Sequence, residues 1–424
     1  MNDKQMQRKK PELLAPAGNL EKLKVACAYG ADAIYLGGKS FGLRALGANF
    51  SPEEMEAGIR YAHALGKKIY VTVNIMPHNA DVDRFPAYLD FLQTVHADAA
   101  IISDLGLFML ARKQTPHLPL HISTQANVVN YASVQAWEKL GATRVVLARE
   151  LAKEEIATIR ANSSVELEVF VHGAMCISYS GRCLLSSYMT GRDANRGACA
   201  QSCRWQYALV EEKRPDEAYE IREDERGTYI LNAKDLCLLP YVGELGALGV
   251  DSLKIEGRMK SAHYVACTTK AYREAIDAWA EQGDAFSVQS AWERELSMAS
   301  HRTYTDGFYR GAHGMGMQIY QGSSYDPGAD FEGLVLDYDA RTKIATVEQR
   351  NVMTADETLE ILRPQGTPFQ QTLQGMTDAE GNPVQRAPHP KQILHIPMKQ
   401  PVMPYAILRR ERLASKKDEH AKGA

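Results

Sequence analysis

Eight short apolar runs, separated by amphipathic stretches, restrict the fold of this 424-residue chain more than any other feature. The separating stretches have helical periodicity, and some begin with capping residues such as Asn19 and Ser51. Strands that alternate with helices form parallel βα units, so this order predicts an α/β fold. The expected strands cover residues 12–16, 33–37, 68–74, 99–103, 118–124, 144–148, 165–172 and 252–256.

A weak internal repeat supports the same prediction. The segments YGADAIYL (29–36), VHADAAII (95–102), LGATRVVL (140–147) and LGVDSLKI (248–255) each pass from a helix end through a short turn into a strand. Eight strands with this repeat favour a (β/α)8 TIM-barrel-like domain over the alternative, an open doubly wound sheet.

The pattern changes twice along the chain. We expect residues 1–290 to form the barrel, with a Cys-rich insertion at 174–230 between strands seven and eight. Residues 291–330 are expected to be a connector. From 331 to 424, short β runs alternate with Asp, Gly and Pro turns, which predicts a small C-terminal all-β barrel domain with a charged tail.

Composition excludes some classes of protein. Hydrophobic residues make up 45% of the chain and charged residues 24%, which is ordinary for a globular protein and excludes a disordered or fibrous one. The net charge of -3 excludes a strongly basic protein that coats nucleic acid, but it is compatible with a local basic patch. The sequence has no secretory leader and no transmembrane stretch, so we expect a cytoplasmic protein with reduced thiols.

Four of the seven cysteines lie close together, at Cys176, Cys183, Cys199 and Cys203, and Cys237 is a further candidate. Clustered thiolates suit Zn or an iron–sulfur cluster, whereas buried reduced thiols are the simpler alternative. Zn ribbons usually carry two tight Cys pairs, so the gap between Cys176 and Cys183 favours iron–sulfur.

Four arginines surround these cysteines against a single acid, Asp193. Guanidinium groups there can balance a thiolate cluster or bind a phosphate or carboxylate, and a surface loop with some arginine is the simpler interpretation. The arginines are Arg182, Arg192, Arg196 and Arg204.

Longer motifs connect the chain to a known family. Residues 168–186 follow the pattern E-x-F-x2-G-A-M-C-x4-G-x-C-x-L-S, which resembles the signature of peptidase family U-32, the collagenase-like peptidases. The segments LLAPAG (13–18), DAIYLGG (32–38), STQ (123–125) and SLKIEGRMKS (252–261) are similar to that family as well. The resemblance covers roughly residues 11–310, and longer members also carry the C-terminal β domain.

The resemblance implies a function, because the chain is most similar to the branch of the family that acts in tRNA hydroxylation. That branch implies an iron–sulfur protein that supports the prephenate-dependent conversion of the wobble uridine of tRNA to 5-hydroxyuridine. It also implies that Cys176, Cys183, Cys199 and Cys203 hold a 4Fe-4S cluster, with Cys237 as the alternative fourth ligand. The expected partners are tRNA, the dicarboxylate prephenate and a protein of the same family.

Two other functions stay open on the sequence alone. A collagenase-like peptidase needs an activated nucleophile, and His172 lies near Cys176, but no H-E-x-x-H motif is present. A lone nucleophile would also leave three neighbouring cysteines unexplained. The third function is a non-catalytic RNA-binding scaffold that uses the C-terminal domain.

Polar residues at the carboxyl ends of the expected strands should line the site of a barrel of this kind. We predict that His172 and Glu256 act as acid–base residues and that four further side chains bind substrate. The binding candidates are Arg44, Gln125, Arg149 and Arg258, with Asn74 and Asn127 nearby in the same positions of their strands. A structural polar group is the alternative for each of them.

Overall fold

The computed structural model describes residues 8–43, 49–176, 178–205, 223–224, 227–228, 234–311 and 326–412. None of the helices in these ranges is both long enough and apolar enough to cross a membrane.

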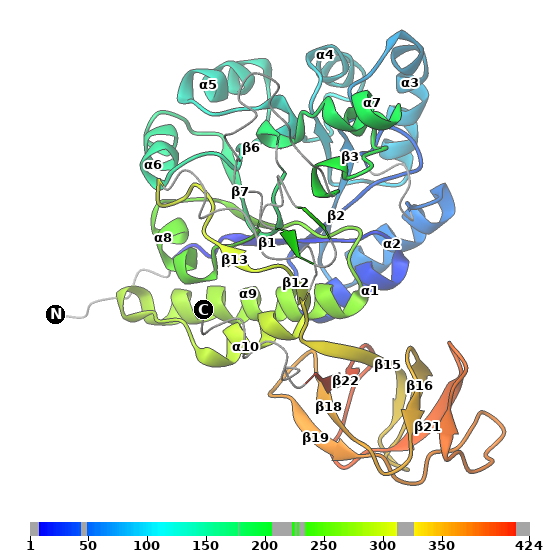
Figure 1. The fold of residues 1–424 in the computed structure, drawn as a ribbon. Coiled ribbons are helices and arrows are strands. Elements are labelled where there is room, and N and C mark those ends of the chain that lie inside the picture. The colour runs from blue at the N-terminus through cyan, green and yellow to red at the C-terminus, as the bar shows by residue number, and fades with distance from the viewer. Residues whose placement is uncertain are drawn as a thin grey trace.

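Eight parallel strands form a closed barrel (Figure 1). The last strand of the barrel pairs with both the first and the seventh, which closes the sheet and rules out the open alternative. The α/β barrel prediction is therefore confirmed. The strands are β1 (Glu12–Pro16), β2 (Ala33–Leu36), β3 (Lys68–Val73), β4 (Ala99–Ile102), β5 (Leu120–Ile122), β6 (Arg144–Val146), β7 (Glu166–Ala174) and β11 (Ser252–Ile255).

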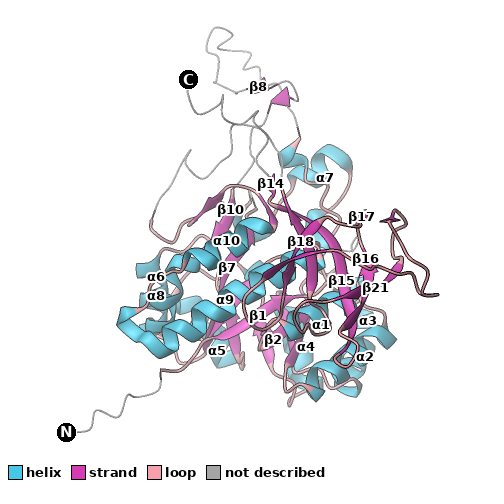
Figure 2. Cartoon of the chain, turned by 90° about the horizontal axis from the view of Figure 1, so that it is seen from below, coloured by secondary structure: helices cyan, strands magenta, loops and turns pink. Residues whose placement is uncertain are grey.

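Helices cover the outside of the barrel, and their ends follow local sequence signals. Ser51 and Glu54 form a reciprocal capping box at the start of α2, and Gly141 ends α5 in the left-handed conformation. The helices are α1 (Leu20–Ala28), α2 (Pro52–Ala64), α3 (Asn79–Thr94), α4 (Leu105–Gln114), α5 (Tyr131–Leu140), α6 (Lys153–Ala161), α8 (Val242–Ala247), α9 (Ala262–Gln282) and α10 (Ser290–Met298). Figure 2 shows α9 beside α1 and α10.

The interior of the barrel contains a buried polar network at its amino-terminal end. Arg144 contacts Glu12 and Glu168 at 2.5 and 3.1 Å, and the Lys254 ammonium lies 2.8 Å from Glu168. Such buried charges are tolerated because each has an ionic partner. Because the Lys254 side chain points into the barrel from its last strand, its charge needs an ionic partner, and Glu168 supplies one.

The Cys-rich segment is built of short turns around one small helix, α7 (Leu185–Thr190). Ser180 and Gln201 adopt left-handed backbone angles in these turns. Beyond the segment, the chain adds two short strands to the barrel sheet. They are β10 (Asp235–Cys237), antiparallel to β7, and β13 (Tyr304–Thr305), parallel to β10.

The C-terminal part is an all-β domain, as expected, with its own hydrophobic core. Its antiparallel sheet curls (Figure 1) and has the strand order β19-β18-β22-β15-β16-β21. The strands are β15 (Ala329–Asp339), β16 (Ile344–Gln349), β18 (Thr358–Leu362), β19 (Phe369–Thr372), β21 (Ile393–Pro397) and β22 (Ile407–Glu411). A separate small ribbon pairs β17 (Met353–Thr354) with β20 (Arg386–Ala387).

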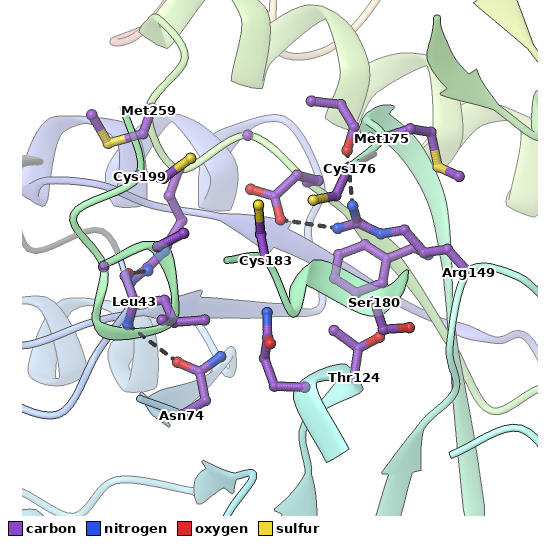
Figure 3. Close-up of a pocket in the computed structure, with 18 of the residues that line it drawn as sticks. Leu43, Asn74, Thr124, Arg149, Met175, Cys176, Ser180, Cys183, Cys199 and Met259 are labelled. Atoms are coloured by element: carbon purple, nitrogen blue, oxygen red, sulfur yellow. Dashed lines mark hydrogen bonds and ion pairs between the residues drawn. The ribbon is translucent and has the colours of Figure 1, made fainter. Parts of the chain in front are cut away.

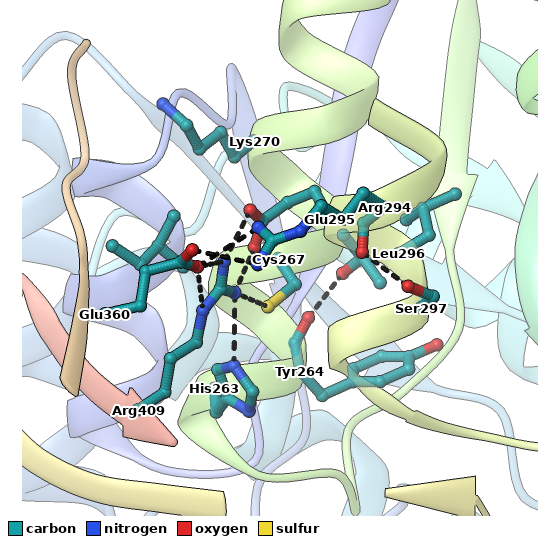
Figure 4. A network of polar contacts seen from close by, with 12 residues as sticks. His263, Tyr264, Cys267, Lys270, Arg294, Glu295, Leu296, Ser297, Glu360 and Arg409 are labelled. Atoms are coloured by element: carbon teal, nitrogen blue, oxygen red, sulfur yellow. Dashed lines mark hydrogen bonds and ion pairs between the residues drawn. The ribbon is translucent and has the colours of Figure 1, made fainter. Parts of the chain in front are cut away.

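Buried ion pairs connect this domain to the barrel helices (Figure 4). The Arg409 guanidinium on β22 binds Glu295 of α10 at 2.5 and 2.9 Å, and its Nε donates to Glu360 of β18 at 2.9 Å. Its Nη1 also lies 3.3 Å from the Cys267 thiol on α9. The network fixes the C-terminal domain against α9 and α10.

Candidate functional site

A cavity of about 600 Å³ opens at the carboxyl ends of the barrel strands. Its walls come from the ends of the barrel strands on one side and from the Cys-rich segment on the other (Figure 3). Among the residues that line it, Arg149, Lys254, Arg258 and Lys260 are basic, whereas Glu150 and Glu256 are acidic. The excess of basic side chains favours an anionic ligand.

Four thiols line this cavity, and they are those of Cys176, Cys183, Cys199 and Cys203. Figure 3 shows the sulfurs of Cys176, Cys183 and Cys199 directed toward the same space. Burial raises the pKa of the Cys176 thiol, and the nearby Cys183 and Cys199 thiols raise it further, while Arg149 lowers it. The structure therefore brings the four predicted ligands together.

Cys237 lies elsewhere. It sits on β10 opposite His172, its sulfur is 3.9 Å from the Tyr272 hydroxyl, and it is absent from the cavity lining. This placement favours Cys203 over Cys237 as the fourth member of the group.

Hydrogen bonds hold the Cys-rich segment in place. The Asn195 side chain accepts from the Cys183 amide at 3.1 Å and donates to the Cys183 carbonyl at 3.0 Å. Ser186 donates to the Arg192 carbonyl and accepts from the Ala200 amide. These bonds between side chains and backbone stabilise the turns of the segment in the absence of a regular sheet or long helix there.

The arginines of the segment form cross-links. Arg182 donates to the Gln125 carbonyl at 2.9 and 3.0 Å, and Arg192 donates to the Ala198 carbonyl at 3.1 Å. Arg196 binds the Met76 carbonyl and the Asp81 carboxylate, which lowers the pKa of Asp81 to about 2. These bonds attach the segment to the loops after β3 and β5. The Arg204 side chain lies outside the described residues.

Arg149 is the best-placed substrate-binding candidate. Its guanidinium stacks on the Phe170 ring at 3.9 Å, donates to the Ala174 carbonyl at 2.8 Å and meets the Glu256 carboxylate at 3.2 Å. Glu256, predicted as an acid–base residue, thus lies in the cavity with a cationic partner. The contacts hold the guanidinium plane close to the thiol of Cys176 (Figure 3).

Arg258 and Gln125 also line the cavity. Arg258 is buried and donates to the Thr72 hydroxyl at 3.3 Å and to the Leu43 carbonyl. Its guanidinium fits only because residue 37 is glycine, since a Cβ there would lie 2.1 Å from Nη1.

The remaining binding candidates have different positions. Asn74 lines the cavity, accepts from the Leu43 amide and donates to the Ser123 hydroxyl. Asn127, in a left-handed turn, donates to the Tyr179 carbonyl and does not line the cavity. Arg44 lies outside the described residues.

His172 is the prediction that the structure corrects. Alternation along β7 would direct it inward with Phe170, but a β-bulge intervenes, because Phe170 pairs with Lys254 and His172 pairs with the next residue, Ile255. His172 therefore points outward, against the Tyr272 ring of α9, where burial lowers its pKa to about 3. It does not line the cavity, so it is not placed to act on a ligand there.

Several lining residues were not predicted from the sequence, among them Glu150, Ser180 and Lys260. Glu150 accepts from the Ser180 amide at 2.5 Å and from its hydroxyl at 2.7 Å, and Lys260 donates to the Ser300 carbonyl at 3.0 Å. Glu150 and Lys260 lie in the loops after strands β6 and β11, where function concentrates in barrels, and that position was an available signal.

The donor set suits a soft metal centre. All four candidate ligands are thiols, which bind iron–sulfur clusters and Zn as thiolates. Yet among the described residues no three Cys, His, Asp or Glu side chains converge closely enough to hold a single metal ion. The four thiols line one cavity, and thiolates of this kind bind either an iron–sulfur cluster or Zn.

The family models match almost the whole chain. Peptidase family U32 matches residues 18–318, and the peptidase family U32 C-terminal domain matches residues 327–409. The chain belongs to peptidase family U32. The family model thus spans every barrel strand except β1, together with all four cavity thiols of this U32 protein.

Several proteins that are similar to this chain have names that concern RNA. The chain is 40% identical to tRNA hydroxylation protein P1 of Bacillus subtilis over 97% of both chains. It is 40% identical to tRNA hydroxylation protein P of Escherichia coli over 95% of this chain and 97% of that protein. It is also 35% identical to 23S rRNA 5-hydroxycytidine C2501 synthase of Escherichia coli, over 72% of this chain and 46% of that protein.

Proposed function

We propose that this protein takes part in RNA hydroxylation, and specifically in the prephenate-dependent formation of 5-hydroxyuridine at the wobble position of tRNA. The observation that carries the proposal is the placement of Cys176, Cys183, Cys199 and Cys203 around one cavity at the functional end of a barrel. Full-length relatives named for tRNA hydroxylation support the choice of RNA.

The cavity thiols would hold a 4Fe-4S cluster. A bound cluster would supply one-electron transfer or a Lewis-acidic iron. The chain's own contribution is to keep the thiols at the cavity wall through the hydrogen bonds between Asn195 and Cys183. Zn bound by the same thiols is the alternative metal.

Prephenate is a dicarboxylate, and the cavity offers basic groups for it. Arg149 presents a planar guanidinium fixed by Phe170, and Arg258 and Lys260 lie in the same lining. Planar guanidinium groups suit bidentate binding of carboxylates. Each of these basic residues already has a protein partner, so ligand carboxylates would bind in addition to, or in exchange for, bonds such as that between Arg149 and Glu256.

The peptidase alternative has less support. A cysteine peptidase needs a histidine beside its thiol. No histidine occurs among the lining residues that the structure describes, and His172 faces α9. A scaffold without catalysis would not need four thiols around a cavity.

The decisive experiment is nucleoside analysis of tRNA from a strain that lacks this gene and any paralogue. We expect 5-hydroxyuridine derivatives to disappear, to return with the wild-type gene, and not to return with Cys176→Ser. Arg149→Ala should lower them while the purified variant keeps its iron. Undiminished 5-hydroxyuridine in the deletion strain, together with peptide hydrolysis by the purified protein, would instead support a peptidase.

A further inference from the structure

The Cys-rich segment has two chemically different faces. Cys183, Cys199 and Cys203 face the cavity, but large apolar side chains between and beside them face solvent. Tyr188 is 92% exposed and Leu184 is 77% exposed, although Cys183, the neighbour of Leu184, is buried. Tyr179 precedes Cys183 and Trp205 follows Cys203 in the sequence, and both side chains are exposed as well.

The geometry of α7 shows that these exposed side chains are not required to hold the segment together. The Tyr188 amide donates to the Leu184 carbonyl at 2.9 Å, so both side chains lie on one face, a helical turn apart. The opposite face carries Ser186, which is buried and makes the hydrogen bonds that close the segment. The outward face is therefore available for a partner.

The exposed charges that flank α7 in sequence indicate what the partner is. Arg182 and Arg192 are exposed, and each uses only part of its five N–H donors on the Gln125 and Ala198 carbonyls. The acid next to Arg192 in sequence, Asp193, accepts from the Asn195 amide. Aromatic rings interleaved with arginine beside a cavity are the features by which proteins bind unpaired RNA, whose bases stack on the rings.

We propose that Tyr179, Tyr188 and Trp205, with Arg182 and Arg192, form a stacking platform for the unpaired bases of an RNA loop. The platform residues hold the bases that flank the target, while the target nucleotide leaves the stack and enters the cavity of about 600 Å³. The proposal rests on the proposed function in taking RNA as the substrate, and it adds the surface and the single-stranded form of the RNA that binds.

The test uses the full chain after anaerobic cluster reconstitution and two fluorescent RNA probes. One is a hairpin with a uridine-containing single-stranded loop, and the other is the same stem as a blunt duplex. We expect the hairpin to bind more tightly than the duplex. Tyr188→Ala should weaken hairpin binding about 10-fold, which is the loss expected for one base–aromatic stack. Tyr188→Phe should retain the affinity, and Tyr188→Leu should not restore it.

A matched control is Leu65→Ala, because Leu65 is 51% exposed at the end of α2, which is the opposite end of the barrel from the cavity. This variant should bind the hairpin like the wild type. Iron content and thermal unfolding should be unchanged in all Tyr188 variants, since the side chain is exposed.

Three results would overturn the platform. The first is equal affinity of the protein for the hairpin and the duplex. The second is an affinity of Tyr188→Ala for the hairpin that equals that of the wild type. The third is self-association of the protein that Tyr188→Ala abolishes without any change in RNA affinity. The last result would assign this face to a protein contact. Normal hairpin binding by Tyr188→Ala, combined with loss of 5-hydroxyuridine in the deletion strain, would reject the platform and leave the proposed function standing.

Discussion

At the scale of single residues, the position of one thiol distinguishes two possible ligand sets. Cys203 lines the cavity with Cys176, Cys183 and Cys199, whereas Cys237 faces the Tyr272 hydroxyl on the helix side of β10. Burial raises the pKa of the Cys237 thiol, and its partly buried side chain packs against the barrel core.

The two cysteines should therefore respond differently to substitution. Cys203→Ser is expected to lose most of its iron and acid-labile sulfide after anaerobic reconstitution, because the cluster would lack one thiolate. Cys237→Ser should retain wild-type iron and the same visible absorbance. The reverse pattern, with iron lost only from Cys237→Ser, would show that Cys237 and not Cys203 is the fourth ligand.

Much of the site followed from one rule, that residues after barrel strands face the ligand. The rule correctly located Gln125, Arg149, Glu256 and Arg258 at the cavity. It failed for His172 because a bulge reverses the alternation of β7 after Phe170, and a bulge depends on the pairing with β11. Pairing partners distant in sequence are not visible in a local pattern.

At the scale of elements, β15 carries an unusual carboxyl group. The Glu332 side chain is fully buried at a bulge between Phe331 and Gly333, and its only described ionic contact is Arg410 at 3.4 Å. Burial and the carboxylates of Glu357 and Asp330 raise the pKa of Glu332, Arg410 and Arg412 lower it, and the net result is a pKa of about 7. The strand therefore folds most readily when this group is protonated.

The raised pKa gives a signed pH dependence. Since the folded-state pKa lies above the ordinary value of 4.5, the stabilisation is complete below about pH 4.5 and is lost as pH rises through about 7. Glu332→Gln should match the wild type near pH 5 and exceed it near pH 8, by up to about 3 kcal/mol in the free energy of unfolding. Urea denaturation at both pH values checks this, and equal stability at both would contradict the assignment.

Regular elements were the most predictable part of the fold. All eight barrel strands were located from apolar runs, because a strand buried on both faces is almost continuously apolar. The strands β10 and β13 were not, since three and two residues are too few to show a pattern. The turns of the Cys-rich segment also escaped prediction, because they depend on specific side-chain bonds such as those of Ser186.

At the scale of the whole molecule, the barrel and the C-terminal domain share buried polar contacts. The hydroxyl of Tyr29, the residue that caps the end of α1, lies 3.1 Å from the carbonyls of Leu362 and Tyr405. Together with the Arg409 network (Figure 4), this contact means that each of the two parts stabilises the other.

Removing the central guanidinium should therefore destabilise both parts. Arg409→Ala leaves Glu295 without its buried partner and is expected to cost about 3–5 kcal/mol in the free energy of unfolding. Arg341→Ala, at an exposed position in the same domain, should change stability by less than about 0.5 kcal/mol. Urea denaturation followed by fluorescence measures both, and a loss below about 1 kcal/mol for Arg409→Ala would show that the network is weak.

The direct pairing of β7 with β11 has a consequence for folding. The Cys-rich segment and β10 lie within residues 175–251, a loop whose two ends are joined by neighbouring strands. The entropic cost of closing a loop rises only with the logarithm of its length, so a long loop adds little to the cost of a short one. The chain can therefore carry the whole Cys-rich segment between β7 and β11 at little extra cost to barrel closure.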